Sequence, residues 1–529
     1  MKVAVVGSGP AATGAVLALV ARGLRPDVID IGERLDDERA AVVASLASVP
    51  KADWPAEALA RIGDNSAGMG EGIPRKLAFG SDYVYARERA YGRVETVDVD
   101  FVPTHATGGY STVWGAAMLP MHADDMTAWP ISRHDLDAHY RAVAAALPLA
   151  GESDALAEVF PTFRDELGAA RQSTPNRVLL EGFRRRGADV GSHHRVGCAR
   201  LAVRDAGPRA CVGCGLCFTG CPMGSIYAAT DTLDALAREQ KLRRHDGRAM
   251  LSIAENAEGV LLEMLRISDR KIERAHYDHV FLAAGPVNSS RILLNSRKLF
   301  GICAMLRDSQ KILLPALLLK RLGHLGREDV PNLAGAFIDL KLEQRSPHWF
   351  HAQVYSVNDQ LLRHFGIDPF APTHLLQRPL RMLLDHALVL LGGMHSDHSS
   401  AIALTIHEDG AMCMPLVRLA SIRNPATPRY VDQFRGALSR LLRQAGAHIV
   451  GRTRIALPGA GAHAGGSFPM RANPRSDLET DRLGCPFGWR RVHLVDGACL
   501  PSIPATTATF TIMANAHRIA SQAELGSSA

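Results

Sequence analysis

An α/β fold that begins with a dinucleotide-binding unit of the Rossmann type is predicted for this chain of 529 residues. The apolar run from Val3 to Val6 has the length and composition of a buried strand. It is followed by the glycine-rich turn from Gly7 to Ala12 and by an alanine-rich helical stretch that ends near Gly23. A second apolar run ends at Asp30. Together these segments form a βαβ unit, which is typical of a parallel sheet.

The turn between the first strand and the helix has the spacing of a phosphate-binding loop. Gly7 permits a tight turn, Gly9 lets the backbone approach a pyrophosphate, and Ala12 is small enough for the helix to pack on the strand. The helix N-terminus then faces the phosphates. Asp30 follows Gly9 by 21 residues, at the place where an acid binds a ribose 2′-hydroxyl. A dinucleotide cofactor is therefore predicted, and this motif alone leaves FAD and NAD open.

Further along the chain the pattern becomes mixed. Amphipathic helices are expected near residues 135–147 and 177–186, after an irregular glycine-rich stretch from 63 to 115. A strand ending at residues 280–285 leads into a helix over 289–295, and the last clear helix runs from about 511 to 523.

The composition argues against several classes of partner. The chain has 60 basic and 54 acidic residues in short scattered runs, so we expect no nucleic-acid partner. The longest apolar runs are short and interrupted, which excludes a transmembrane helix. No signal-peptide pattern follows Met1, and the nine cysteines do not form a disulfide framework. A cytoplasmic, reducing location is expected.

Four of the cysteines crowd into eleven residues. Cys211, Cys214, Cys217 and Cys221 have the spacing of a bacterial iron–sulfur run, and Pro222 follows them. No second run is present, so the four thiolates would hold one 4Fe–4S cluster, or three of them a 3Fe–4S centre. A zinc ion held by four thiolates and a turn without any metal are the alternatives.

Three separated segments share order and spacing with one family of flavoenzymes. The first is the glycine-rich stretch 108–115, and the second is residues 282–285 with Arg291 after them. The third comprises residues 463–466, 495–498 and 511–516. On these segments the chain resembles the glucose-methanol-choline (GMC) oxidoreductases from its first strand to its last helix. Some bacterial members are also similar in carrying a cysteine-rich segment.

The resemblance implies FAD as the cofactor and a catalytic pair at the C-terminus. His463 stands where the family has a histidine beside the flavin, and imidazole is suited to accept a hydroxyl proton near neutral pH. Thr507 falls where the family usually has His or Asn, and it can orient a substrate oxygen but cannot act as a base. Contacts with FAD are expected from a set of small and polar residues: Gly7, Gly9, Ala12, Asp30, Gly108, Gly109, Ser111, Gly115, Gly285, Asp496 and Thr507.

The resemblance also implies two domains built from discontinuous segments. An FAD-binding α/β domain would take residues 1–135, 201–300 and 456–529, and a substrate domain with an antiparallel sheet would take 136–200 and 301–455. His395 and Asp397 are additional candidates for the pocket wall.

The expected activity is oxidation of an alcohol group by hydride transfer to FAD. The family analogy favours a sugar-like or natural-product substrate. Electrons would pass to an acceptor, such as a partner protein, with the iron–sulfur cluster as one route. Two alternatives stay open, namely an oxidase that uses oxygen and an electron-transfer subunit that relays electrons without an alcohol substrate.

Overall fold

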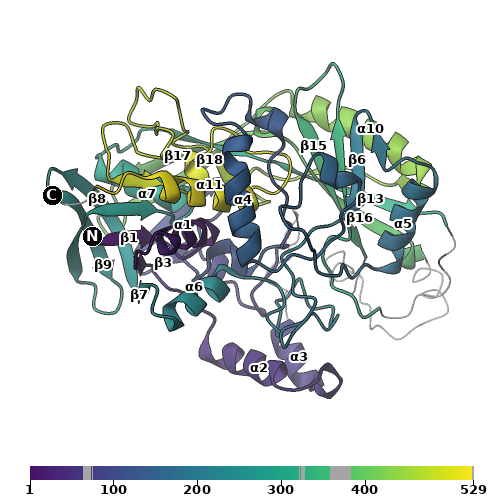
Figure 1. The fold of residues 1–529 in the computed structure, drawn as a ribbon, viewed down its shortest axis with the longest axis horizontal. Coiled ribbons are helices and arrows are strands. Elements are labelled where there is room, and N and C mark those ends of the chain that lie inside the picture. Colours follow the sequence, from purple (N-terminus) through teal and green to yellow (C-terminus); the bar gives the residue numbers. More distant parts are fainter. Residues whose placement is uncertain (64–72, 74, 321, 323–327, 358–382, 527–529) are drawn as a thin grey trace.

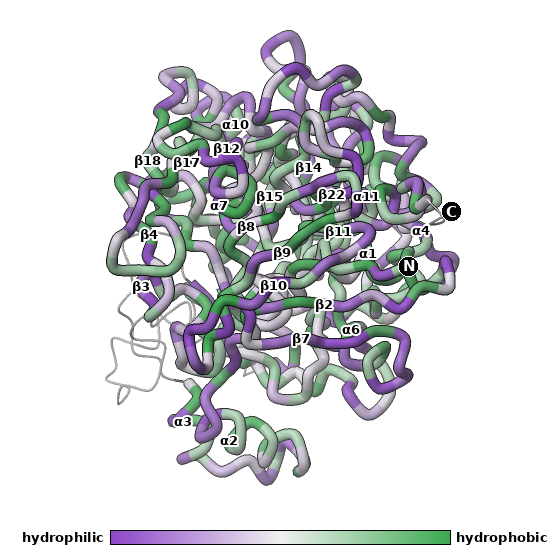
Figure 2. The backbone as a smooth tube through the Cα atoms, turned by 90° about the vertical axis from the view of Figure 1, so that its left-hand side faces the viewer, coloured by the Kyte–Doolittle hydropathy of each residue, from purple (hydrophilic) through white to green (hydrophobic). Residues whose placement is uncertain are grey.

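The computed structural model describes residues 1–63, 73, 75–320, 322, 328–357 and 383–526. Two regions lie side by side in it (Figure 1). One contains both chain ends and the N-terminal βαβ unit, and the other contains a large antiparallel sheet. Helices α2 (Asp37–Ala47) and α3 (Ala56–Gly63) project away from the rest of the chain (Figure 2).

The predicted βαβ unit forms the centre of a five-stranded parallel sheet. Its strand order is β22-β11-β1-β2-β7, so segments from the whole length of the chain meet in it. The five strands are β1 (Val3–Val6), β2 (Asp27–Ile29), β7 (Arg243–His245), β11 (His279–Leu282) and β22 (Val492–Leu494). The helices around it include α1 (Pro10–Ala21), α6 (Ala229–Arg238), α7 (Pro286–Ser296) and α11 (Thr509–Gln522).

Two further sheets flank the parallel sheet. A three-stranded antiparallel sheet consists of β8 (Arg248–Asn256), β9 (Gly259–Arg266) and β10 (Ile272–Tyr277). A six-stranded sheet has the order β21-β12-β17-β18-β4-β3. Its strands are β3 (Glu88–Arg89), β4 (Gly92–Val97), β12 (Ala304–Asp308), β17 (Ala401–His407), β18 (Leu416–Ile422) and β21 (Ala464–Gly465).

The second region is an eight-stranded antiparallel sheet covered by helices. The order is β19-β13-β16-β15-β14-β6-β5, and β20 also pairs with β13. The strands are β5 (Val190–Gly191), β6 (His194–Cys198), β13 (Lys311–Leu318), β14 (Ala336–Lys341), β15 (Trp349–Ser356), β16 (Ala387–Gly393), β19 (Ala447–Ile449) and β20 (Arg454–Ile455). Helices α5 (Thr174–Arg185) and α10 (Thr427–Gln444) pack on it, with Phe183 and Phe434 fully buried against the strands.

The mixed α/β architecture with an antiparallel second sheet confirms the predicted fold class. The expected helices are present with small differences at their ends. The helix expected over 177–186 begins at Thr174, and the helix expected over 289–295 begins at Pro286. Proline occupies the first turn of both helices, where its fixed φ and missing N–H are tolerated. Helices α4 (His134–Ala146) and α11 (Thr509–Gln522) agree with the expectations for 135–147 and about 511–523.

No helix in the described part of the chain is long and apolar enough to cross a membrane.

Candidate active site

The glycine turn after β1 is held in a conformation that only glycine adopts readily. Gly7 has a φ of +108°, and its N–H donates to the carbonyl of Ile29 at 2.7 Å. A Cβ atom at Gly7 would overlap the carbonyl oxygen of Ala283, at the end of β11. Gly7 therefore lets α1 start close against the parallel sheet, and Ala12 is fully buried in the same contact.

A second glycine loop lies directly against this turn. A Cβ atom on Gly109 would be 3.3 Å from Cα of Gly9, so the two loops touch through their backbones. The N–H of Gly108 donates to Ser8 Oγ at 2.9 Å. Ser111 Oγ donates to the carbonyl of Gly108 at 2.6 Å and accepts from the N–H of Ala229 at 2.9 Å. Gly108 and Ser111 thus fix the loop that faces the first turn.

Two buried acids close the same region. Asp30 Oδ1 accepts from the N–H of Gly32 at 2.6 Å, and burial raises the pKa of Asp30 to about 6. Asp496 Oδ2 accepts from the N–H of Gly285 at 2.9 Å and from Ser289 Oγ at 2.5 Å. Burial also raises the pKa of Asp496 to about 6. Asp496 therefore ties the C-terminal segment to the start of α7.

These elements enclose a cavity of about 170 Å³. Its wall includes most of the residues expected to contact the nucleotide: Gly7, Gly9, Asp30, Gly109, Gly285 and Asp496.

Arg291 of α7 also lines this cavity. Its side chain is buried, and its Nε and Nη1 atoms have no hydrogen-bond partner. Burial lowers the pKa of Arg291 to about 10. A buried guanidinium with unused donors is costly unless an anionic group binds it, so the cavity suits a phosphorylated cofactor. The sequence already indicated that Arg291 belongs to the site, because this residue lies in one of the family-like segments.

A second cavity of about 260 Å³ adjoins the first. The two share Pro10, Phe101, Tyr110, Ala462 and Thr509 in their walls. Ser111, Gly115 and His463 line the second cavity. Aromatic rings and a few polar groups make up much of the remaining wall: Arg75, Lys76, Tyr85, Asp100, Trp114, Phe218, Asn332 and Tyr355.

His463 is held in this wall with a free ring nitrogen. Its carbonyl accepts from the N–H of Ser309 at 3.0 Å, and its Nδ1 atom is buried without a hydrogen-bond partner. The pKa of His463 lies well below its usual value because of burial, with smaller contributions from the charges of Lys311 and His351. The imidazole is therefore neutral at neutral pH and free to accept a proton.

Lys311 and Asp308 are buried near His463 and influence each other electrostatically. Burial lowers the pKa of Lys311 to about 8 and raises that of Asp308. Lys311 Nζ donates to Ser309 Oγ at 3.2 Å, while Asp308 Oδ2 accepts from the N–H of Gly459 at 3.0 Å. Neither residue belongs to a motif, so sequence reasoning missed both.

Thr507 lies outside the walls of both cavities. It is buried, and its hydroxyl donates to the carbonyl of Ala117 at 2.9 Å. The threonine that lines both cavities is Thr509, at the start of α11. Four further predicted residues line neither cavity, namely Ala12, Gly108, His395 and Asp397.

The cysteine segment reaches the second cavity. Cys217 and Phe218 line its wall, next to the buried Lys76. Burial raises the pKa values of Cys211, Cys214 and Cys217, and that of Cys214 reaches about 11. No three of the four sulfur atoms come within 4.8 Å of one another. A zinc ion with Zn–S bonds of about 2.3 Å brings its sulfur ligands to roughly 3.8 Å from one another, so the thiols would have to move closer together to bind one zinc ion.

The arrangement combines a parallel sheet with a separate antiparallel sheet, as the resemblance implies. A solved structure with this fold is that of pyridoxine 4-oxidase from Mesorbium loti, with a TM-score of 0.60. It is 16% identical in sequence, and the match covers 99% of both chains. At this level of identity the likeness establishes a shared fold. No model of a known protein family matches the sequence, and no curated protein matches it either.

Proposed function

We propose that this protein oxidises an alcohol group with FAD as the hydride acceptor and His463 as the base. The observation that carries the proposal is the position of His463. His463 has a buried ring nitrogen without a partner, and the residue lines the second cavity, which directly adjoins the cavity built by the nucleotide-binding glycines. Because the two cavities share a wall, a substrate in the second meets the reactive end of a cofactor that extends from the first.

The residues of the first cavity fit FAD. Gly7 and Gly9 leave the backbone open to a pyrophosphate at the N-terminus of α1, and Arg291 offers unused donors. Asp30 directly follows β2, where an acid can accept from a ribose hydroxyl. Asp496 holds the C-terminal segment against the start of α7. When bound, FAD supplies an acceptor for the hydride that leaves the alcohol carbon.

His463 would accept the hydroxyl proton of the substrate. Its low pKa keeps the ring unprotonated at neutral pH, although the same low pKa makes it a weak base. The proton transfer therefore fits best when it accompanies departure of the hydride, because the hydroxyl becomes more acidic at that stage. Thr507 supports the site through its bond to Ala117, and Thr509 is the hydroxyl that faces the cavities.

The wall of the second cavity suits a sugar-like or natural-product alcohol. Aromatic rings such as Tyr85 and Trp114 can pack on the apolar face of such a molecule, while Asp100 and Asn332 can bind its hydroxyls. Pyridoxine also belongs among the candidate substrates, because it is the substrate named for the similar solved structure.

Electrons would leave through an iron–sulfur cluster held by Cys211, Cys214, Cys217 and Cys221. Two observations support this route. Cys217 lines the same cavity as His463, and the four cysteines have the spacing of a bacterial iron–sulfur run. The final acceptor would be a partner protein or a small oxidant.

Anaerobic mixing of the FAD-loaded protein with a panel of sugars, polyols, aromatic alcohols and pyridoxine tests the proposal. Bleaching of the oxidised flavin absorbance by at least one alcohol is expected. If no member of the panel reduces the flavin, while a chemical reductant reduces both flavin and iron–sulfur centre, an electron-transfer subunit becomes the better description. Rapid reoxidation by oxygen alone would instead favour an oxidase.

A further inference from the structure

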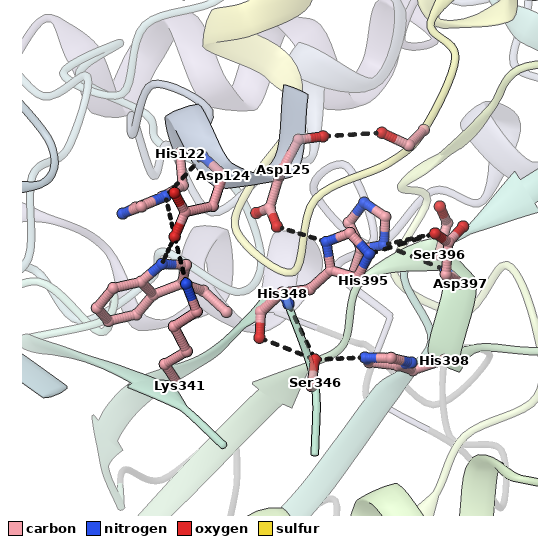
Figure 3. Close-up of polar contacts among 12 residues, drawn as sticks. His122, Asp124, Asp125, Lys341, Ser346, His348, His395, Ser396, Asp397 and His398 are labelled. Carbon is pink, nitrogen blue, oxygen red and sulfur yellow. Dashed lines mark hydrogen bonds and ion pairs between the residues drawn. The ribbon is translucent and has the colours of Figure 1, made fainter. Parts of the chain in front are cut away.

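Away from the two cavities, three side chains from separate segments point toward one another (Figure 3). Asp125 belongs to the short 3-10 helix η5 (Ala123–Met126), His348 directly precedes β15, and His395 directly precedes the 3-10 helix η7 (Ser396–His398). One donor atom from each lies within 4.8 Å of the other two. Among the described residues, no other group of three His, Cys, Asp or Glu side chains converges this closely.

One ring nitrogen in this group is buried and has no hydrogen-bond partner. His395 is 1% exposed and Asp125 is 4% exposed. His395 Nε2 has no hydrogen-bond partner, whereas His348 Nδ1 lies 2.9 Å from Asp125 Oδ1. A buried polar atom without a partner destabilises the fold, so an occupant that binds this nitrogen would stabilise it.

Asp397 contacts both histidines from the other side. Its Oδ2 atom is 3.3 Å from His348 Nε2 and 3.7 Å from His395 Nδ1. Histidines that bind metal ions commonly direct their second ring nitrogen at a carboxylate, which fixes the ring and increases its basicity. With Asp397 in that role, His348 Nδ1 lies against Asp125 Oδ1, and His395 Nε2 is left without a hydrogen-bond partner. The Asp397 side chain is 47% exposed, which gives an ion access from solvent.

We propose that Asp125, His348 and His395 bind one divalent transition-metal ion, with zinc as the ion of first choice. Two imidazoles and one carboxylate are a typical zinc ligand set, and ligand bonds of about 2.0–2.2 Å place neighbouring donors roughly 3.4 Å apart. The donors here span from 2.9 Å to less than 4.8 Å, so small rotations bring them onto one ion. The imidazole rings of His348 and His395 are stacked with centroids 3.5 Å apart, so one ring must turn out of the stack for both nitrogens to reach one ion. Imidazole ligands favour zinc over magnesium or calcium.

The ion would anchor the C-terminal segment to the eight-stranded sheet. Ser502 Oγ donates to the carbonyl of Asp125 at 3.3 Å, and the N–H of Ile503 donates to Ser396 Oγ at 3.1 Å. Both bonds connect residues just before α11 to the metal-binding group. The inference does not depend on the proposed alcohol oxidation.

Zinc retention by the purified full-length protein tests the site. After chelator treatment and dialysis, protein loaded with zinc alone should retain one equivalent more than the His395→Ala variant. Any zinc taken up by the four clustered cysteines would be the same in both proteins, so only this difference counts. His398→Ala is the matched control, since His398 lies in the same cluster and bonds Ser346 Oγ at 2.6 Å but is not a ligand. It should retain as much zinc as the wild type.

Cobalt gives a second readout that separates the two kinds of site. Cobalt in the proposed site has nitrogen and oxygen ligands, so its ligand-field bands should disappear in His395→Ala while thiolate charge-transfer absorbance stays unchanged. If His395→Ala does not fold, Asp125→Asn should show the same loss. Equal zinc in wild type and His395→Ala, or equal losses in His395→Ala and His398→Ala, would overturn the proposal.

Discussion

The backbone N–H of Ser309 donates a 3.0 Å hydrogen bond to the carbonyl oxygen of His463. This bond fixes His463 against the start of β13, two residues from Lys311, whose side chain is buried. The proposed base is therefore held next to a fixed cationic group, and the first two predictions follow from that pairing.

Replacing His463 by Ala should slow flavin reduction by roughly 10²–10⁴-fold, the usual cost of removing a positioned general base. FAD binding should persist, and the residual rate should rise with pH as hydroxide takes over. Anaerobic stopped-flow absorbance measures the rate of flavin reduction. As a matched control, Thr507→Ala should lose about 0.5–1.5 kcal/mol of stability with its bond to Ala117, and little rate. A wild-type reduction rate in His463→Ala would remove His463 from the mechanism.

The pH profile should report the neutral state of His463. The pKa of His463 lies well below 6.5, so the reduction rate should stay flat through neutral pH and fall only on stronger acidification. In the double variant Asp308→Asn/Lys311→Met the nearby cation is gone and no buried carboxylate is left unpaired. The acid limb should then move upward by roughly one pH unit. An unchanged acid limb would mean that Lys311 does not influence the base.

Arg291→Met should weaken FAD binding. The guanidinium is buried in the nucleotide cavity with two unpartnered nitrogens, and a hydrogen bond to a charged group contributes about 1.5–3 kcal/mol, or roughly 10–150-fold in affinity. Fluorescence titration of the apoprotein with FAD measures this. Arg274→Met on the exposed strand β10 is the control and should bind like the wild type. Equal affinities in all three proteins would exclude Arg291 from cofactor binding.

Cys214→Ser should remove iron while leaving flavin reduction by the alcohol intact. The variant should transfer electrons more slowly to a one-electron acceptor, because the proposed exit route is broken. Iron and sulfide analysis of anaerobically prepared protein gives the first readout and acceptor kinetics the second. Cys303→Ser, at an exposed cysteine far from the run in sequence, serves as the control. Stoichiometric zinc, or no metal at all, in the wild type would contradict the cluster.

The parts of the fold that could be predicted are those with local signals. Strand β1, helix α1 and strand β2 were predicted almost to their ends, because the glycines and Pro10 mark the turns between them. Strand β4 was missed inside the stretch expected to be irregular. It pairs in parallel with β18, more than 300 residues further along the chain, and no local pattern reveals such a partner.

The same distinction applies to the candidate site. Gly7, Gly9, Asp30 and His463 belong to motifs with defined spacing, and all four line one of the two cavities. Lys311 is the first residue of the apolar strand β13, and its sequence position does not indicate a role in the site. Only the tertiary structure brings its charge close to His463. The convergence of Asp125, His348 and His395 was equally hidden, because the three come from segments that meet only when both regions are folded.

The strand order of the parallel sheet has a consequence for biosynthesis. Strand β22 (Val492–Leu494) completes the sheet at the edge of β11, and it is made more than 200 residues after that strand. A ribosome therefore releases the N-terminal βαβ unit long before its sheet can close, and the nascent chain carries an unpaired strand edge until β22 has been made. The proposed cofactor can be retained only after that point. A nonsense mutation anywhere before Val492 should yield protein that cannot retain flavin, however intact its first domain.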